Sequence, residues 1–476
     1  MRWLALVVLC MAELMIVLDT TIVNVALPSI RSDLGFSETS LAWVVNAYLL
    51  TFGGCLLLGG RFGDLFGQRR LFLAGITLFT LASLACGLST TQGLLVGARA
   101  AQGVGGAVAS AVSLALMMNL FTEPAERARA MGTFGFVSSG GGSIGVLLGG
   151  VLTDVLNWHW IFLVNLPIGA AVCVLTLRLL PICRDPDASG RVDVAGAISV
   201  TAALVIAVYA IVGGNQVGWT SSRTLGLLLT AAGLLALFLI VESRVREPLV
   251  PLRLFRLRNV SVANGVGVLW AGAMFAWFFL SALYLQFVLG YTPLELGLAF
   301  LPANLVMGAL SLGVSAQLVM RFGMKRPLAV GLLFAAAGLA LLTRTPVDGH
   351  YAADVLPGMI LLGIGAGIAF NPVLLAAMSD VAPAEAGLAS GMVNTSFMMG
   401  GALGLAVLAS AAASRSSHLL DAGSSRLSAL TGGYHLAFAI GALFALAAAV
   451  AGATLLQTGA YAGAPHDAAA VAADEP

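Results

Sequence analysis

Charged residues are scarce in this chain. They make up 9% of its 476 residues, whereas hydrophobic residues make up 59%. Soluble domains carry roughly 25% charged residues, so this composition leaves too little polar surface to cover a water-soluble protein of this size. The net charge is +1 and no basic cluster stands out, which argues against a nucleic-acid partner. The composition therefore predicts a polytopic membrane protein surrounded by the lipid bilayer.

Lysine is almost absent, and paired cysteines and clustered histidines are missing. Lys325 is the only lysine, so no P-loop can bind ATP in this chain, because that motif requires Gly-Lys-Ser/Thr. The cysteines show no Cys-x-x-Cys spacing, and the histidines are scattered without a His-Glu-x-x-His motif. We therefore expect no disulfide framework, no metal site and no other bound cofactor, and we expect that the protein is not an enzyme.

Long apolar runs make up most of the sequence. Fourteen runs of about 20 mainly apolar residues predict fourteen transmembrane helices. The first run contains Glu13 and Asp19 and has no convincing cleavage site, so we expect a permanent helix rather than a signal peptide. With the N-terminus inside, 17 Lys and Arg residues fall on the inner side and 5 on the outer side. The positive-inside rule then predicts that both termini are cytoplasmic.

Two segments of the first half return in the second half. The segment "RFGDLFGQRR" (61–70) is echoed by "LVMRFGMKRP" (318–327), and "MGTFGFVSSGGGSIG" (131–145) by "GMVNTSFMMGGALG" (391–404). Two six-helix halves separated by two further helices would produce these offsets, and many secondary transporters are built from such repeats. The predicted units are an N-terminal six-helix bundle over 1–181, two inserted helices over 192–243, a C-terminal six-helix bundle over 254–459 and a disordered cytoplasmic tail over 460–476.

Several of these motifs resemble the major facilitator superfamily. "GGRFGDLFGQRR" is similar to its inner-loop signature, "RAAQGVGGAV" to its fourth-helix motif, and "LDTTIVNVALP" to the first-helix motif of its fourteen-helix drug:proton antiporters. "WHWIFLVNLPIG" also resembles that family. The resemblance implies a major facilitator fold and the export of amphipathic drugs or natural products in exchange for protons, by a monomer that draws on the proton gradient. Abundant Ala and Gly, and Arg in preference to Lys, suggest a GC-rich bacterial genome. We expect the protein in the plasma (inner) membrane.

Three charged residues lie at membrane depth, where a charge costs about 2.5–3.5 kcal/mol on insertion scales. At about 1.5 Å per residue, Asp19 of the first span and Arg99 of the fourth reach a similar depth. A contact between them would lower the cost of both. Glu13 lies about 9 Å further inward, so the two acids could take and release a proton on opposite faces of a cavity. The alternative is a fixed structural pair, with Glu13 forming only an interhelical hydrogen bond.

The resemblance implies roles for two further groups of residues. A charge latch would close the two halves on the inner side, and its residues are Gly60, Asp64, Gly67, Arg69 and Arg70. The alternative for this loop is a solvated segment that serves only the positive-inside rule. The fourth- and fifth-helix motifs contribute Gln102, Gly103, Gly141, Gly145, Gly149 and Gly150. Gly141, Gly145 and Gly149 are spaced by four residues, which predicts close helix packing. Val146 stands where the family usually has a proline, which removes an expected bend.

Substrate contacts are expected among aromatic and uncharged polar residues inside the spans. Trp270 and Trp277 lie seven residues apart on nearly one helix face, where they could form a wall for a flat or cationic apolar ligand. Packing or lipid contact explains them equally well. The polar candidates are Asn46, Gln286, Asn304 and Asn371, although such residues commonly link helices by hydrogen bonds.

Three other functions remain open at this point. The first is a narrow-substrate exporter of one antibiotic or metabolite, which would give self-resistance. The second is a proton-coupled importer. The third, a membrane-embedded enzyme or sensor, would need a cluster of catalytic residues.

Overall fold

The structure is a computed structural model that describes most of the chain. It covers residues 2–457 except for 122, 181–192, 246–247, 249, 380 and 382–384. The predicted tail over 460–476 and the predicted boundary at 181–192 therefore lie outside the described residues. The helical backbone at Asp64 is described, but its side chain is not.

Fourteen helices in the described residues are long and apolar enough to cross a membrane, and this part of the chain contains no strand. The predicted all-α polytopic fold is thus confirmed. The elements are α1 (Arg2–Leu34), α2 (Glu38–Phe66), α3 (Gln68–Gly87), α4 (Gln92–Leu120), α5 (Pro124–Val155), α6 (Trp160–Leu163), α7 (Asn165–Leu179), α8 (Val194–Val217), α9 (Ser222–Arg244), η1 (Leu252–Arg256), α10 (Arg258–Phe287), α11 (Pro293–Ala309), η2 (Leu310–Val314), α12 (Ser315–Phe322), α13 (Lys325–Leu342), η3 (Tyr351–Val355), α14 (Leu356–Met378), α15 (Ala386–Asp421) and α16 (Arg426–Leu455).

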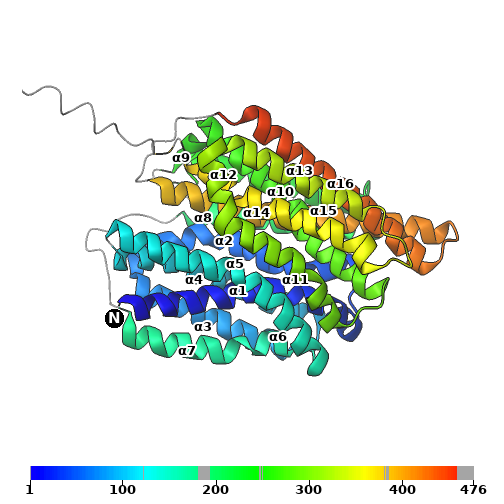
Figure 1. The fold of residues 1–476 in the computed structure, drawn as a ribbon, viewed down its shortest axis with the longest axis horizontal. Helices are drawn as coiled ribbons and strands as arrows, with labels where there is room; N and C mark the ends of the chain where they lie inside the picture. The colour runs from blue at the N-terminus through cyan, green and yellow to red at the C-terminus, as the bar shows by residue number, and fades with distance from the viewer. Residues whose placement is uncertain are drawn as a thin grey trace, which may run out of the picture.

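The helices form two bundles that lie side by side, the N-terminal one below and the C-terminal one above in Figure 1. Within the N-terminal bundle, α4 packs against α2 and α3, and α1 packs against α5. Within the C-terminal bundle, α10 packs against α15 and α16, and α13 packs against α14. Across the interface, α2 contacts α15, α5 contacts α11, and α1 contacts α10. We call the side where α1 begins and α16 ends the terminal side, and the other the opposite side.

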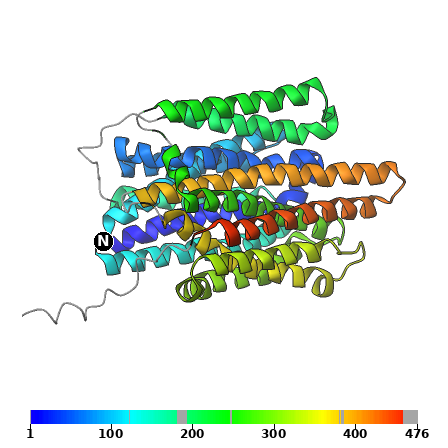
Figure 2. The ribbon, with the colours of Figure 1, turned by 90° about the horizontal axis from the view of Figure 1, so that it is seen from above.

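The two inserted helices lie at one edge of the molecule, as Figure 2 shows for the green pair. α8 packs against α9 and also contacts α2 and α15, one helix from each bundle. It therefore covers the interface along that edge. Ser410 of α15 donates a hydrogen bond of 3.1 Å to the carbonyl of Ile211 in α8.

The internal repeat is visible in the backbone. Gly67 and Gly323 occupy equivalent turns, before α3 and α13, and both adopt a positive φ, 93° and 74°. Residues with side chains rarely adopt such a conformation, which explains glycine at both turns. The helix pairs α3–α4 and α13–α14 also correspond, because glycines let the two helices of each pair approach closely. A Cβ on Gly75 of α3 would lie 3.0 Å from the Gly105 carbonyl of α4. A Cβ on Gly331 of α13 would lie 2.9 Å from the Gly365 carbonyl of α14.

Candidate functional site

A buried ion pair lies in the middle of the N-terminal bundle. Asp19 of α1 and Arg99 of α4 have exposed fractions of 0% and 1%, and an Arg99 Nη1 atom donates to Asp19 Oδ2. The predicted contact between these two charges is present. An isolated charge at this depth would be costly, and each of these residues offsets the cost of the other.

Three polar side chains complete the surroundings of Asp19. Gln102 Nε2 donates to Asp19 Oδ1 at 2.5 Å, and Asn165 Nδ2 donates to the same oxygen at 3.2 Å. Gln102 also accepts a hydrogen bond of 2.8 Å from Arg99 and donates one of 2.7 Å to Ser83 Oγ. Side chains of α4 and α7 thus contact the carboxylate of α1 directly, and Ser83 of α3 holds Gln102 and Asn165 in place.

Arg99 is enclosed by aromatic rings and a backbone carbonyl. Its guanidinium carbon lies 4.5 Å from the centre of the Tyr48 ring and 5.7 Å from that of Phe162. Its Nε donates to the Val44 carbonyl at 3.0 Å. Such rings stabilise a cation while keeping water away. Electrostatic interactions are stronger in such a low-dielectric site, so a change in the charge of Asp19 would strongly affect Arg99.

The sequence motifs pointed to some of this cluster and missed other members. Gln102 was assigned to the fourth-helix motif for packing, yet it bridges Asp19, Arg99 and Ser83. Asn165 belongs to the quoted segment "WHWIFLVNLPIG", where a single amide between apolar residues was the available signal. Ser83 has no such signal, because small hydroxyl residues are common in transmembrane helices.

Glu13 lies apart from this cluster, closer to the terminal side. It is 8% exposed, and Ser110 Oγ of α4 donates to its Oε2 at 3.4 Å. Six residues along a helix separate it from Asp19 by about 9 Å. The two acids therefore have different surroundings: Asp19 lies in the network of Arg99, Gln102 and Asn165, whereas Glu13 contacts Ser110 of α4.

The predicted latch residues surround the turn between α2 and α3. Gly67 forms that turn, Arg70 is exposed, and Arg69 donates to the carbonyl of Leu177 near the end of α7. A Cβ on Gly60 would meet no atom within 4 Å. Since the side chain of Asp64 lies outside the description, the latch stays a prediction.

The glycines of the fifth-helix motif line the contact between α5 and α1. A Cβ would meet Val17 at Gly141, Thr21 at Gly145 and Ile22 at Gly149, so the predicted close packing is present. The segment Gly141–Gly145 also matches the letters Gly-x-Ser-x-Gly of some hydrolases. It lies inside α5 rather than at the strand-to-helix turn which that chemistry needs.

Gly103 and Gly150 pack against other helices. A Cβ on Gly103 would lie 2.5 Å from the Tyr48 carbonyl of α2, and one on Gly150 would lie 2.7 Å from the Pro293 carbonyl of α11. Val146, in the place of the usual proline, is buried within a continuous α5. Its carbonyl lies 2.9 Å from the Cβ position of Gly297.

The two bundles contact each other closely on the opposite side. Besides the approach of α5 to α11 at Gly150, Gln286 Nε2 of α10 donates to the Val25 carbonyl of α1 at 3.1 Å. The guanidinium carbon of Arg31 lies 4.7 Å from the centre of the Phe287 ring. We call this set of contacts, α1 with α10 and α5 with α11, the opposite-side seal.

The six predicted substrate residues do not share one cavity. Gln286 belongs to the opposite-side seal, and Asn371 donates to the Ser311 carbonyl in the π-helical turn η2 at 2.9 Å. Asn46 and Asn304 are buried, and neither side-chain amide has a hydrogen-bond partner among the described residues. Trp277 packs against Phe278 and Phe300, with ring centres 4.4 and 6.2 Å away.

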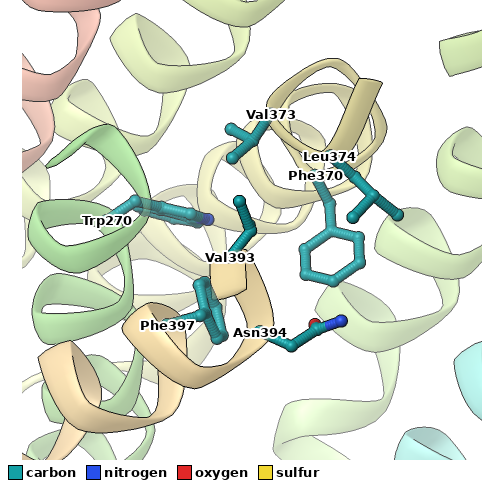
Figure 3. Close-up of a pocket in the computed structure, with 7 residues that line it drawn as sticks. All are labelled: Trp270, Phe370, Val373, Leu374, Val393, Asn394 and Phe397. Carbon is teal, nitrogen blue, oxygen red and sulfur yellow. The ribbon is translucent and has the colours of Figure 1, made fainter. Parts of the chain in front are cut away.

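Trp270 differs from the other five because it lines a small cavity of about 10 Å³ in the C-terminal bundle (Figure 3). Among the described residues, no group of three or more His, Cys, Asp and Glu side chains could hold a metal ion. The geometry thus supports a buried charge network in one bundle and a small cavity in the other.

Comparison with known proteins agrees with the fold. The family model of the Major Facilitator Superfamily matches residues 9–405. The puromycin resistance protein pur8 of Streptomyces alboniger is 42% identical over 452 residues, which are 93% of this chain and 89% of that protein. The cephamycin export protein CmcT of Amycolatopsis lactamdurans is 41% identical, over 85% of this chain and 84% of its own. The multidrug resistance protein Stp of Mycobacterium tuberculosis is 38% identical, over 86% and 75%.

Solved structures share the architecture at low sequence identity. A bacterial homologue of the human lysosomal transporter Spinster, in an inward-facing and unoccupied conformation, gives a TM-score of 0.68 at 15% identity and covers 96% of this chain and 97% of its own. The human organic anion transporter MFSD10 (TETRAN) gives a TM-score of 0.60 at 16% identity, over 95% and 99%. The family model and the sequence relatives together show that this chain belongs to the Major Facilitator Superfamily.

Proposed function

We propose that this protein is a proton-coupled antiporter that exports amphipathic drugs or natural products across a bacterial plasma membrane. The observation that carries the proposal is the buried cluster of Asp19, Arg99, Gln102 and Asn165. Relatives at 38–42% identity are named for puromycin resistance, cephamycin export and multidrug resistance. The transporter acts as a monomer, and both termini lie in the cytoplasm because the basic residues gather on the terminal side.

Asp19 carries the coupling proton in this proposal. When Asp19 is ionised, Arg99 is neutralised by it and the four-helix cluster is held together. When a proton binds Asp19, the ion pair is lost and Arg99 remains as a buried charge without its counterion, which is costly. The two protonation states therefore favour different arrangements of α1 and α4. A proton can shift the equilibrium between two conformations of the transporter only if it binds one of them more tightly than the other.

Alternating access follows from the contacts between the bundles. The opposite side corresponds to the cell exterior, and its seal joins α1 to α10 and α5 to α11. Release of a substrate to the exterior requires this seal to separate. The inner loop with Asp64 and Arg70 acts as the matching latch on the cytoplasmic side, and Glu13 is the alternative proton carrier nearer that side.

Transport by the purified protein in proteoliposomes tests the proposal, with puromycin as the probe. An imposed pH gradient should drive puromycin against its own gradient, and a protonophore should abolish this movement. Asp19→Asn cannot change its charge, so it should lose the uphill movement and keep exchange of puromycin down its gradient. Glu13→Gln is the matched comparison. Uphill transport at the wild-type rate by Asp19→Asn would contradict the assignment of Asp19, and transport that persists without a proton gradient would contradict antiport.

A narrow-substrate exporter is the second candidate. Several relatives are named for single antibiotics, including a lincomycin resistance protein and a tetracenomycin C resistance and export protein. A sensitive host that expresses this chain should then resist one compound and remain sensitive to chemically unrelated ones. Resistance to several unrelated compounds would favour the multidrug function instead.

A further inference from the structure

A tyrosine hydroxyl lies between the two acids of the N-terminal bundle. Tyr48 of α2 is 1% exposed, and the guanidinium carbon of Arg99 lies 4.5 Å from the centre of its ring. The hydroxyl end of the same side chain approaches α4, because a Cβ on Gly106 would lie only 3.0 Å from Tyr48 Oη. Glycine at this position of α4 therefore leaves the room that the hydroxyl occupies.

The depth of this hydroxyl follows from the contacts that α4 makes on either side of it. Gln102 of α4 contacts Asp19, and Ser110 of α4 contacts Glu13. Gly106 lies four residues from each, which is about 6 Å along the helix in either direction. Residues four apart lie on the same face of a helix. The hydroxyl beside Gly106 is therefore midway in depth between the contact of Asp19 and the contact of Glu13.

The Tyr48 hydroxyl is buried, and it has no hydrogen-bond partner among the described residues. A buried polar group without a partner costs free energy, so its presence calls for a functional explanation. The charged side chains that interact electrostatically with Tyr48 are Asp19, Arg99 and Glu13.

The two acids are too far apart to form a hydrogen bond with each other. Asp19 and Glu13 are separated by about 9 Å along α1 and by about a third of a turn around it, whereas a hydrogen bond between oxygens spans about 2.5–3.0 Å. A hydroxyl can donate one hydrogen bond and accept another at the same time. The Tyr48 hydroxyl is thus a chemically suitable link between the two carboxyl groups.

We propose that the Tyr48 hydroxyl relays the coupling proton from Asp19 to Glu13. The O–H bond of protonated Asp19 breaks as its proton binds Tyr48 Oη, and the original O–H bond of Tyr48 breaks as that proton binds the Glu13 carboxylate. Each step spans a hydrogen bond or one bridging water. Tyr48 is neutral before and after the transfer, Asp19 regains its negative charge, and Glu13 becomes neutral. The ion pair with Arg99 then forms again, which removes the cost of an unpaired buried charge.

This relay rests on the proposed proton antiport and adds the route by which the proton leaves Asp19. Glu13 lies nearer the terminal side, so it acts in series with Asp19 and delivers the proton to the cytoplasm. Tyr48 has two separate tasks: its ring stabilises the charge of Arg99, and its hydroxyl passes the proton. Tyr48→Phe keeps the first task and loses the second.

Transport by Tyr48→Phe in proteoliposomes tests the relay, with puromycin as the probe. Under an imposed pH gradient, uphill transport of puromycin should be at least tenfold slower than in the wild type. Exchange of puromycin without a gradient and the unfolding temperature in detergent should stay at their wild-type values, because Arg99 keeps its aromatic cover. Tyr434→Phe is the matched control, since Tyr434 is equally buried but lies in α16 of the other bundle. It should leave uphill transport unchanged.

Glu13→Gln provides a second variant, with an expected loss of similar size. Because both groups serve one route, Tyr48→Phe combined with Glu13→Gln should be no slower than the slower single variant. Three results would overturn the relay and leave antiport standing: wild-type uphill transport by Tyr48→Phe, an equal loss of its exchange without a gradient, or a double variant whose loss is the product of the two single losses. A wild-type protein that moves no puromycin against its gradient would instead contradict antiport, and the relay with it.

Discussion

At the scale of single residues, the central question is why an aspartate persists in an apolar helix. Asp19 receives hydrogen bonds or an ion pair from Arg99, Gln102 and Asn165, so its negative charge is balanced and its oxygens are well satisfied. Removing one partner of a buried pair destabilises a protein by about 3–5 kcal/mol, since the other charge remains uncompensated. The pair is therefore a structural element as well as a candidate for proton coupling, and the two roles need separate measurements.

Asp19→Asn combined with Arg99→Gln separates these roles. Asp19→Asn alone should lower the free energy of unfolding by about 3–5 kcal/mol, because Arg99 stays charged without its counterion. The double variant should recover at least half of that loss, yet it should remain inactive in proton-driven transport. Thermal unfolding in detergent measures the first quantity and proteoliposome transport the second. Equal losses of stability in the single and double variants would show that the two charges do not depend on each other.

At the scale of helices, glycine determines how closely α5 can approach α1. A Cβ at Gly149 would lie 2.8 Å from the carbonyl oxygen of Ile22, and a backbone atom cannot move aside as a side chain can. In contrast, a Cβ at Gly142 would lie 3.8 Å from Thr21 Cγ2, an ordinary contact.

Gly149→Ala should therefore lower the free energy of unfolding by about 1–3 kcal/mol, as overpacking does in cores. Gly142→Ala is the control on the same helix and should lie close to the wild type. Thermal unfolding of both variants measures the difference. A normal unfolding temperature for Gly149→Ala would mean that α1 and α5 can separate without cost, contrary to the packing in the structure.

The approach of α5 to α11 gives a second prediction at this scale. A Cβ at Gly150 would lie 2.7 Å from the Pro293 carbonyl, so Gly150→Ala should push these helices apart and weaken the opposite-side seal. A cysteine at Val25, which is fully buried in that seal, should then react at least fivefold faster with a membrane-impermeant thiol reagent. Gly132→Ala, where a Cβ would meet no atom, should leave the rate unchanged. Equal rates in the two variants would contradict the seal.

At the scale of the whole molecule, the bundles must move relative to each other if the proposed transport cycle is correct. The opposite-side seal joins them through α1 and α10, while α8 contacts a helix of each bundle at one edge. Movement that opens the seal must therefore also slide α8 along α2 or α15.

Cross-linking across the seal tests this movement. Cysteines are placed at Val25 and Gln286 and joined by a reducible bifunctional thiol reagent. The cross-link should slow transport at least tenfold, and its reduction should restore transport. Cysteines at Arg258 and Leu455, whose residues contact each other within the C-terminal bundle, form the control, and their cross-link should have little effect. Undiminished transport with the Val25–Gln286 link in place would exclude a cycle in which this seal opens.

The sequence by itself determined the class of the protein, the number of spans and the internal repeat. These properties depend on local composition and on spacing, because a segment of about 20 apolar residues crosses a bilayer whatever its neighbours are. The pairing of Asp19 with Arg99 was also predictable, since charges at equal depth in lipid need a partner. The close packing at Gly141, Gly145 and Gly149 followed from their spacing of four residues.

Only the tertiary structure decided which distant residues share one environment. Asn165 contacts Asp19, and Ser83 contacts Gln102 and Asn165, because α7 packs against α1 and α3 packs against α4. No local pattern encodes this proximity. In the same way, Trp270 lines a cavity with Asn394 while Trp277, seven residues away on the same helix, is packed among Phe278 and Phe300. Hydropathy and helical spacing treat these two tryptophans alike, and the difference arises from the packing of α14 and α15 around α10.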